Sequence, residues 1–394
     1  MALSLALIIL FGLTADYLFT RMRLPGLIGM LVTGILLGPH MFDLIKPDLL
    51  RVSSDFRMIA LVVILLRAGL ETKRDTLNRV GSTAITMSCL PAIFEGIAVM
   101  FAANMLLGIS FIEAAILGSI VAAVSPAVVV PLMVNFIERG KGTEKGIPTL
   151  ILAASAIDDV FVIVIFSVLL GIYAGGTTSI ALSLLQIPFS IILGILTGTT
   201  AGLIVYRVFV KYRPRATKKS LVLIGISIIL VWFEGVIQSF IHISALIGIM
   251  TIGFIILEKS EPMAHIISKK LGKVWIFAEI LLFVLVGAQV NINVAWEAGL
   301  TGALVILIGL IFRSIGTYIS VMGTDLNFNE KMFCVVAYIP KATVQAAIGA
   351  VPLAAGVESG EIILAVAVLS IILTAPVGAI GIKFAGERVL KESG

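Results

Sequence analysis

Long apolar stretches recur along the whole chain, and short segments that carry most of the charged residues separate them. Each stretch is close to the roughly 20 residues that a helix needs to cross a hydrocarbon core of about 30 Å. A transmembrane β-barrel would instead show alternating segments of about ten residues. The pattern predicts an all-α polytopic membrane protein with about thirteen spanning helices, at residues 2–20, 24–42, 55–71, 81–107, 111–137, 147–174, 179–206, 219–238, 241–258, 273–292, 299–322, 331–354 and 359–385.

The composition supports this prediction. Apolar residues make up 59% of the chain and charged residues only 13%, whereas soluble domains carry about 25% charged residues. A net charge of +5 could indicate a nucleic-acid partner in a soluble protein, but here the basic residues lie in short loops between spans, so no nucleic-acid partner is expected. Cys89 and Cys334 both lie inside predicted spans and indicate neither a disulfide framework nor a metal site.

The distribution of basic residues predicts the orientation. If the N-terminus lies outside, the inner loops hold 22 of the 28 Lys and Arg residues, and the outer loops hold Lys46, Arg51 and Arg57. This is a strong positive-inside signal. We therefore expect a multi-pass protein of the cell (inner or plasma) membrane, with a cytoplasmic C-terminus. The basic residues Arg21 and Arg23 follow the first apolar run rather than precede it, which favours a retained helix over a secretory signal.

The thirteen spans can be divided into two groups of six spans with one span between them. We expect one transmembrane unit over 1–394, built from a first repeat at 1–174, a linker at 175–218 and a second repeat at 219–394. The linker contains the seventh span and a basic cytoplasmic loop. Two spans carry matching interruptions, at Ser125-Pro126 and Pro131 in the fifth and at Pro340 and Pro352 in the twelfth. Matched interruptions in two halves point to a transporter binding site, although proline is also common in ordinary membrane helices.

Two adjacent carboxylates lie at the middle of the sixth span. A charge there costs about 2.5–3.5 kcal/mol on insertion scales, so it is rare without a function. Because adjacent helical residues point about 100° apart, Asp158 and Asp159 cannot face each other as a dyad, but they can line one crevice. Ser155 lies one turn earlier on the same face, and Ser125 lies at the interruption of the fifth span. Carboxylate and hydroxyl oxygens suit a hard cation; a purely structural pair of aspartates is the alternative.

Two further charged residues lie in the middle of their spans. Glu95 lies in the fourth span of the first half, and Arg313 lies in the fourth span of the second half. A buried Arg must meet a carboxylate, and the candidates are Glu95, which we favour, and Asp158. Lys341 follows Pro340, where it could hold the carbonyl groups of the interrupted segment or lie in a water-filled funnel.

Glycines at four-residue spacing mark two helix faces, Gly194, Gly198 and Gly202 in the seventh span and Gly34 and Gly38 in the second. Small residues at this spacing allow close helix packing. We favour packing within one protomer over a dimer interface.

Five ordered segments together resemble the cation/proton antiporter superfamily, and they are most similar to the NHA-type sodium/proton exchangers (exchanger subfamily B) and their bacterial relatives. The segments are LPGLIGMLVTGILLGP (24–39), LLRAGLE (65–71), SPAVVVP (125–131), SAIDDV (155–160) and PKATVQAA (340–347). The resemblance implies inverted repeats with crossed, broken helices at the fifth and twelfth spans. It also implies a separate dimerisation domain, elevator-like movement, homodimers, and Asp159 as the main cation ligand.

One position departs from the pattern of that superfamily. Its electrogenic bacterial members pair the first Asp of the motif with a Lys on the helix equivalent to the eleventh span, and electroneutral members have Asn instead of that Asp. This chain has Asp158 and Arg313, and Arg does not release its proton in proteins. A second proton carrier could then only be Asp158. Because two adjacent buried carboxylates cannot easily both stay ionised, we predict that Asp158 binds a proton and that two protons move per sodium ion.

The expected function is therefore secondary sodium (or lithium)/proton antiport, with no enzymatic activity, no cofactor, and Na⁺, H⁺ and membrane lipid as partners. Potassium/proton exchange is an open alternative within the same superfamily. An ion channel would need a continuous polar pore lining, which the spans do not show. An intramembrane aspartyl protease would need aspartates on two different helices, and only the sixth span offers any at mid-depth.

Overall fold

The computed structural model describes residues 1–22, 26–174, 180–237, 243–289 and 292–392. Within these ranges the regular secondary structure is helical, apart from an isolated bridge between Lys141 and Glu392. The helices are α1 Ala2–Arg21, α2 Gly26–Leu37, α3 Pro47–Arg51, α4 Ser53–Glu71, α5 Arg74–Leu107, α6 Phe111–Val121, α7 Pro126–Glu138, α8 Ile147–Tyr173, α9 Ile180–Tyr212, α10 Ala216–Ile237, α11 Ala245–Lys259, α12 Glu261–Ala288, α13 Ile292–Ser320, α14 Phe328–Ala337, α15 Thr343–Ile348, α16 Val351–Ala354 and α17 Gly360–Val389.

The apolar stretches fold as membrane-spanning helices. Nine helical segments of the described residues are long and apolar enough to cross a membrane, and α2, α4, α11 and the run α14–α16 occupy the remaining predicted spans. The all-α polytopic fold is therefore confirmed, whereas the count of thirteen stays a prediction. The predicted span starts at 24, 179 and 241 and the span end at 238 lie outside the described residues.

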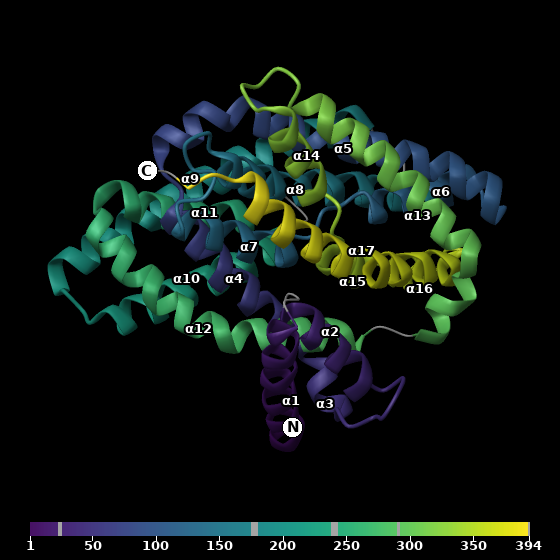
Figure 1. The fold of residues 1–394 in the computed structure, drawn as a ribbon, viewed down its shortest axis with the longest axis horizontal. Helices are drawn as coiled ribbons and strands as arrows, with labels where there is room; N and C mark the ends of the chain where they lie inside the picture. The colour runs from purple at the N-terminus through teal and green to yellow at the C-terminus, as the bar shows by residue number, and fades with distance from the viewer. Residues whose placement is uncertain (23–25, 175–179, 238–242, 290–291, 393–394) are drawn as a thin grey trace.

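The helices pack into two bundles. The panel bundle contains α1, α2, α4 and α9–α12, in which α12 packs on α2 and α4, and α11 packs on α4 and α9. The core bundle contains α5–α8 and α13–α17, in which α5 packs along α13, α6 and α8, and α17 packs on α13 and α14. Figure 1 shows α9–α12 on one side of the molecule and α5, α6, α13 and α17 on the other. Each bundle thus combines helices from both halves of the chain.

Close helix packing within the panel bundle depends on glycine. A Cβ atom on Gly194 would lie 2.5 Å from the backbone oxygen of Ser244, and one on Gly198 would lie 2.3 Å from that of Gly248. A Cβ atom on Gly202 would lie 3.0 Å from the side chain of Ile255. The glycine face of α9 therefore packs against α11 and the residue before it. Packing within one protomer, as the spacing predicted, is confirmed for this face.

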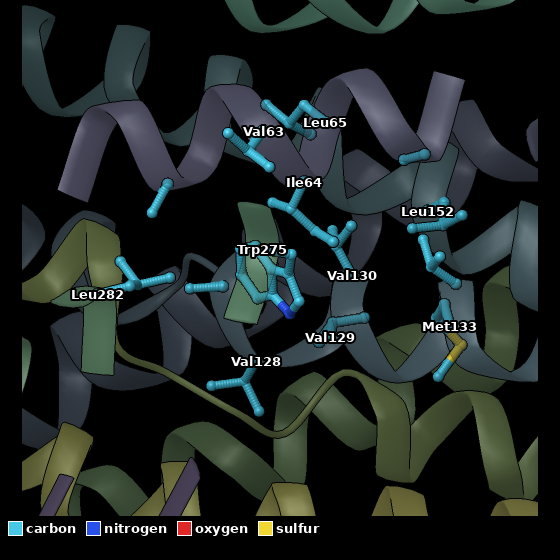
Figure 2. Close-up of a cluster of buried hydrophobic side chains, with 14 of the residues drawn as sticks. Val63, Ile64, Leu65, Val128, Val129, Val130, Met133, Leu152, Trp275 and Leu282 are labelled. Carbon is cyan, nitrogen blue, oxygen red and sulfur yellow. The ribbon is translucent and has the colours of Figure 1, made fainter. Parts of the chain in front are cut away.

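The two bundles meet along an apolar seam between α4 and α7. Figure 2 shows the side chains of this seam, with Ile64 of α4 and Val130 of α7 turned toward each other. Nearer to the C-terminal ends of both helices, Arg67 of α4 forms an ion pair with Glu138 of α7. The other ion pairs between the bundles in the described residues join Lys73 to Glu261 and Arg74 to Glu258. They lie at the α4–α5 connection, where the chain itself crosses from one bundle to the other. The seam is therefore dry at its centre and polar at one end.

The core bundle contains two interrupted helices. The first is α6 followed by α7, with a break at residues 122–125, and the second is α14 followed by α15 and α16, with breaks at 338–342 and 349–350. Both α6 and α14 begin with a capping box, Ser110–Glu113 and Asn327–Glu330 respectively, in which side chains satisfy the free amide groups of the first turn. Both first halves are therefore anchored in the same way before they break.

Proline explains where the helices resume. Pro126 occupies the first position of α7, where the N–H group that proline lacks would have no helical partner. The predicted second interruption at Pro131 is wrong, because α7 continues through this residue to Glu138. A single missing N–H group is tolerated in a membrane helix when neighbouring helices enclose it, and the adjacent residues of α7 are buried.

Candidate functional site

The two breaks touch each other at the centre of the core bundle. The amide N–H of Ser125 donates to the carbonyl of Pro340 at 2.8 Å, and the hydroxyl groups of Ser125 and Thr343 lie 3.3 Å apart. The side-chain amide of Gln345 donates to the carbonyls of Ile120 and Ala123, at 2.9 Å and 3.0 Å. Two segments that lie more than 200 residues apart in the sequence are thus joined by direct hydrogen bonds.

One guanidinium group connects both breaks with both predicted carboxylate partners. Arg313 of α13 is buried, and its Nη1 lies 2.8 Å from Oε2 of Glu95 while its Nη2 lies 3.4 Å from Oδ1 of Asp158. It also donates to the carbonyls of Tyr338 and Ala122, which are the C-cap residues of α14 and α6. A cation is favourable at helix C-termini, where unpaired carbonyls carry partial negative charge. Arg313 therefore performs the task that the sequence suggested for Lys341.

Lys341 occupies a different position from the two that the sequence suggested. Its side chain is buried, and its ammonium group lies 2.8 Å and 2.9 Å from the two carboxylate oxygens of Glu95. Its contacts are thus made with a carboxylate rather than with carbonyl groups, and it does not lie in a funnel. Its backbone N–H donates to the hydroxyl of Thr374 of α17 at 2.9 Å. Lys341 supports the break by tying it to α5 and α17.

The two adjacent aspartates have different surroundings. Asp158 is fully buried, and it accepts a hydrogen bond from the amide of Val124 at 2.9 Å in addition to the contact with Arg313. Asp159 is 5% exposed, and its Oδ1 has no hydrogen-bond partner. A buried polar atom without a partner costs free energy unless something binds it. The two carboxylates therefore cannot have the same role.

The charges around Asp158 balance. Glu95 and Asp158 carry two negative charges, and Arg313 and Lys341 carry two positive ones, which sum to zero. All four side chains are buried, where an uncompensated charge would be very unfavourable. Asp159 lies beside this neutral cluster and adds a carboxylate that no positive side chain contacts within salt-bridge distance in the described part of the chain.

The predicted hydroxyl ligands lie near the aspartates in the fold. Ser155 is buried on α8 and donates its proton to the carbonyl of Leu152 at 3.0 Å. Its oxygen lone pairs are thereby left to accept from or coordinate a partner. Ser125 is also buried, at the start of α7. Within the described residues, no cluster of three or more His, Cys, Asp or Glu side chains forms a metal-ion site.

A large cavity opens between the two bundles. Its volume is about 900 Å³, and α4, α7, α8, α11 and α12 contribute to its lining. The lining contains Glu71, Glu138, His265 and Lys269, and it includes Thr149 of α8. Thr149 precedes Asp158 by nine residues, which corresponds to about 14 Å along a helix. The cavity thus reaches α8 near the C-terminal ends of α4 and α7 and stops about 14 Å along the helix from Asp158.

Comparison with known proteins identifies the family. The family model described as "Sodium/hydrogen exchanger, transmembrane" matches residues 5–388. Sodium/hydrogen exchanger 9B2 of Mus musculus is 34% identical over 389 residues, which cover 94% of this chain and 69% of that protein. The chain belongs to the sodium/hydrogen exchanger family. Sodium/hydrogen exchanger 9B1 of Homo sapiens is 32% identical, with 93% of this chain and 73% of that protein covered.

The fold of this exchanger also occurs in a solved structure. The sodium proton antiporter MjNhaP1 from Methanocaldococcus jannaschii superimposes with a TM-score of 0.79 over 98% of this chain and 97% of that one, at 18% sequence identity. At this identity the match shows the fold alone. The resemblance seen in the five sequence segments is thereby confirmed at the level of family and fold.

Some residues that build the site of this exchanger were not predicted from the sequence. Gln345, Thr343, Tyr338 and Thr374 all contact the breaks or the charged cluster. Gln345 and Thr343 belong to the segment PKATVQAA, where polar residues inside an apolar span were a visible signal. Tyr338 contributes its backbone carbonyl, which any residue type would supply, so the sequence carried no signal for it.

Proposed function

We propose that this protein exchanges Na⁺ or Li⁺ for H⁺ across a membrane, and that both ions compete for Asp159. One observation carries the proposal: Asp159 has a buried carboxylate oxygen without a partner beside a charged cluster that is already neutral. The sodium/hydrogen exchangers among its relatives support the choice of ions. Ser155, Ser125 and the backbone carbonyls near the breaks would supply further oxygen ligands of the kind a hard cation prefers.

Competition at one carboxylate couples the two ion flows. When Asp159 binds a sodium ion or a proton, the buried site carries no net charge and can move past the apolar seam. When Asp159 is empty, its charge would have to cross a dry region, which costs about 2.5–3.5 kcal/mol or more. The empty carrier therefore crosses slowly. Each sodium ion that leaves on one side is exchanged for a proton that binds there.

The charge balance favours one proton per sodium ion. The sequence predicted that Asp158 also releases a proton, because two adjacent carboxylates repel each other. In the structure Asp158 instead contacts Arg313 and the amide of Val124, and Lys341 compensates Glu95. We therefore propose that Asp158 is a permanent anion that fixes Arg313, and that exchange through Asp159 is electroneutral.

The two bundles suggest how the site reaches both sides. We propose that the core bundle carries Asp159 past the panel bundle in an elevator-like movement, along the seam between α4 and α7. Matching capping boxes and breaks support inverted repeats at 1–174 and 219–394 with a linker at 175–218. We further propose a homodimer in the cell membrane, with the N-terminus outside and the C-terminus cytoplasmic. In that orientation the cavity of about 900 Å³ opens to the cytoplasm.

Ion flux in proteoliposomes tests the function and the stoichiometry together. We expect a sodium or lithium gradient, but not a potassium gradient, to drive proton movement across vesicles that contain the protein. An imposed potassium–valinomycin potential should not change the final pH gradient. Because one net charge per cycle would add about 2.3 kcal/mol per 100 mV, a clear response to the potential would mean that a second proton moves. Proton movement driven by potassium would favour the potassium/proton alternative, and no movement with any cation would contradict exchange.

A further inference from the structure

A second, smaller cavity lies within the core bundle, about one turn along α8 from the two aspartates. Its volume is about 220 Å³, and α5, α6 and α8 line it, with Ala115, Ser119 and Phe161 among the lining residues. Val162 also lines it, and Phe161 and Val162 directly follow Asp159 in the sequence. The cavity therefore shares a wall with the proposed exchange site without being part of it.

The lining offers nothing that would hold water. Ser119 carries the one polar side chain among the lining residues, and its hydroxyl already donates to the carbonyl of Ile116 at 2.7 Å. Apolar cavities of this kind stay dry, and an engineered cavity of about 150 Å³ with a similar lining binds benzene. The chemistry of this cavity thus selects a hydrocarbon group.

The cavity is continuous with the surface that faces lipid. Ile93 and Ile97 of α5 contribute to the lining and are 41% and 50% exposed. They lie within the span Val80–Leu107, which is long and apolar enough to cross a membrane. Such side chains are exposed to the hydrocarbon of the bilayer rather than to water. A hydrocarbon chain can therefore enter the cavity directly from the membrane.

We infer that this cavity binds the end of one phospholipid acyl chain. The bound chain packs against Phe161 and Val162 on α8 and against Ala122 at the end of α6. The carbonyl of Ala122 accepts a hydrogen bond from Arg313, so the acyl chain lies directly behind the charged cluster. The inference concerns lipid binding and does not depend on which ions are exchanged.

Fluorescence quenching by brominated lipid tests the inference. The three native tryptophans are replaced by phenylalanine, and Phe161→Trp places a single reporter in the cavity wall. The protein is reconstituted in vesicles of phosphatidylcholine whose acyl chains carry bromine atoms, which quench tryptophan on contact. We expect strong quenching of this reporter. Weak quenching, at the level of a buried tryptophan, would show that the cavity is empty and would overturn the inference.

A variant that fills the cavity distinguishes a bound acyl chain from contact with bulk lipid. Ala115→Leu adds a larger side chain to the cavity lining, and we expect it to reduce the quenching of the Phe161→Trp reporter by more than half. The matched control is Ala303→Leu, which adds the same side chain to a partly buried alanine of α13 outside the cavity and should leave the quenching unchanged. Equal quenching in both variants would mean that the reporter only touches bulk lipid, which also overturns the inference.

Thermal unfolding provides a second readout that does not need the reporter. Ligands that bind only the folded state raise its melting temperature. Adding phosphatidylcholine to the delipidated protein in detergent should raise the melting temperature of the wild type and of Ala303→Leu. The rise should be clearly smaller for Ala115→Leu, because leucine already occupies the cavity. An equal rise in all three proteins would contradict the inference.

Discussion

At the scale of single residues, the site depends on a difference between two neighbouring aspartates. Asp158 faces Arg313 and a backbone amide, whereas one oxygen of Asp159 faces no partner. The turn of the helix separates them by about 100°, so Asp158 can join the charged cluster and the break at Val124 while Asp159 stays outside these contacts. In the proposed mechanism the same residue type serves once as a fixed anion and once as an ion ligand.

This difference predicts opposite effects of two otherwise identical substitutions. Asp159→Asn should reduce sodium-dependent proton flux to the level of empty vesicles and leave the melting temperature unchanged or higher, because a buried carboxylate without a partner is removed. Asp158→Asn should lower the melting temperature, since it leaves the cluster with an excess positive charge. Proton flux in proteoliposomes and thermal unfolding in detergent are measured for both variants. Normal exchange by Asp159→Asn would rule out Asp159 as the ion ligand.

The charge balance of the cluster predicts a second pattern. Arg313→Ala leaves two carboxylates and one ammonium group, and Glu95→Ala leaves two cations and one carboxylate. Breaking a buried pair in this way costs about 3–5 kcal/mol. In the double variant Lys341 and Asp158 remain and their charges cancel, so we expect it to be more stable than the sum of the two single losses implies.

Recovery in this double variant should be partial, because the carbonyls of Ala122 and Tyr338 lose their donor when Arg313 is removed. Thermal unfolding of the wild type, both single variants and the double variant forms a complete cycle. Strictly additive losses would mean that Glu95 and Arg313 do not stabilise each other.

At the scale of helices, the sequence predicted where the breaks occur but not what holds them. Pro126 and Pro340 lie at the observed breaks, because proline cannot continue a helix without losing a hydrogen bond. The partners of the freed carbonyls come from α13 and α15, and no local pattern reveals which distant donor will meet which carbonyl. Arg313 could be assigned a carboxylate from charge alone, whereas its two carbonyl contacts and the sharing of Glu95 with Lys341 required the fold.

The error at Pro131 has the same physical origin. A proline near the start of a new helix and a proline at a break look alike in the sequence, and only the enclosing helices decide whether the chain continues. The family could be predicted from five ordered sequence segments, and the all-α architecture could be predicted because the length of an apolar run is a local property. The roles of Asp158 and Lys341 could not, because they depend on charges that meet from three helices (α5, α8 and α13) and the break between α14 and α15.

At the scale of the whole molecule, the seam between the bundles decides whether an elevator-like movement is possible. The centre of the seam is apolar (Figure 2), so the surfaces can slide without breaking buried hydrogen bonds. The ion pair between Arg67 and Glu138 lies at one end of it and lines the mouth of the large cavity through Glu138. This pair must separate if the core bundle moves relative to the panel bundle.

A reversible cross-link at this pair tests the movement. Cys89 is replaced by alanine, the buried Cys334 is kept, and Arg67→Cys is combined with Glu138→Cys. The matched control combines Arg139→Cys with Glu387→Cys, which replaces an ion pair that lies within the core bundle. A short thiol-reactive linker that contains a disulfide joins each pair of cysteines.

Because only the linker in the variant with Arg67→Cys and Glu138→Cys ties the two bundles together, we expect it to stop exchange, and exchange should recover after the linker is reduced. The control should exchange equally well before and after linking. Undiminished exchange in the linked Arg67–Glu138 variant would mean that the two bundles do not move past each other at this seam, and that Asp159 reaches the two sides of the membrane by a different movement.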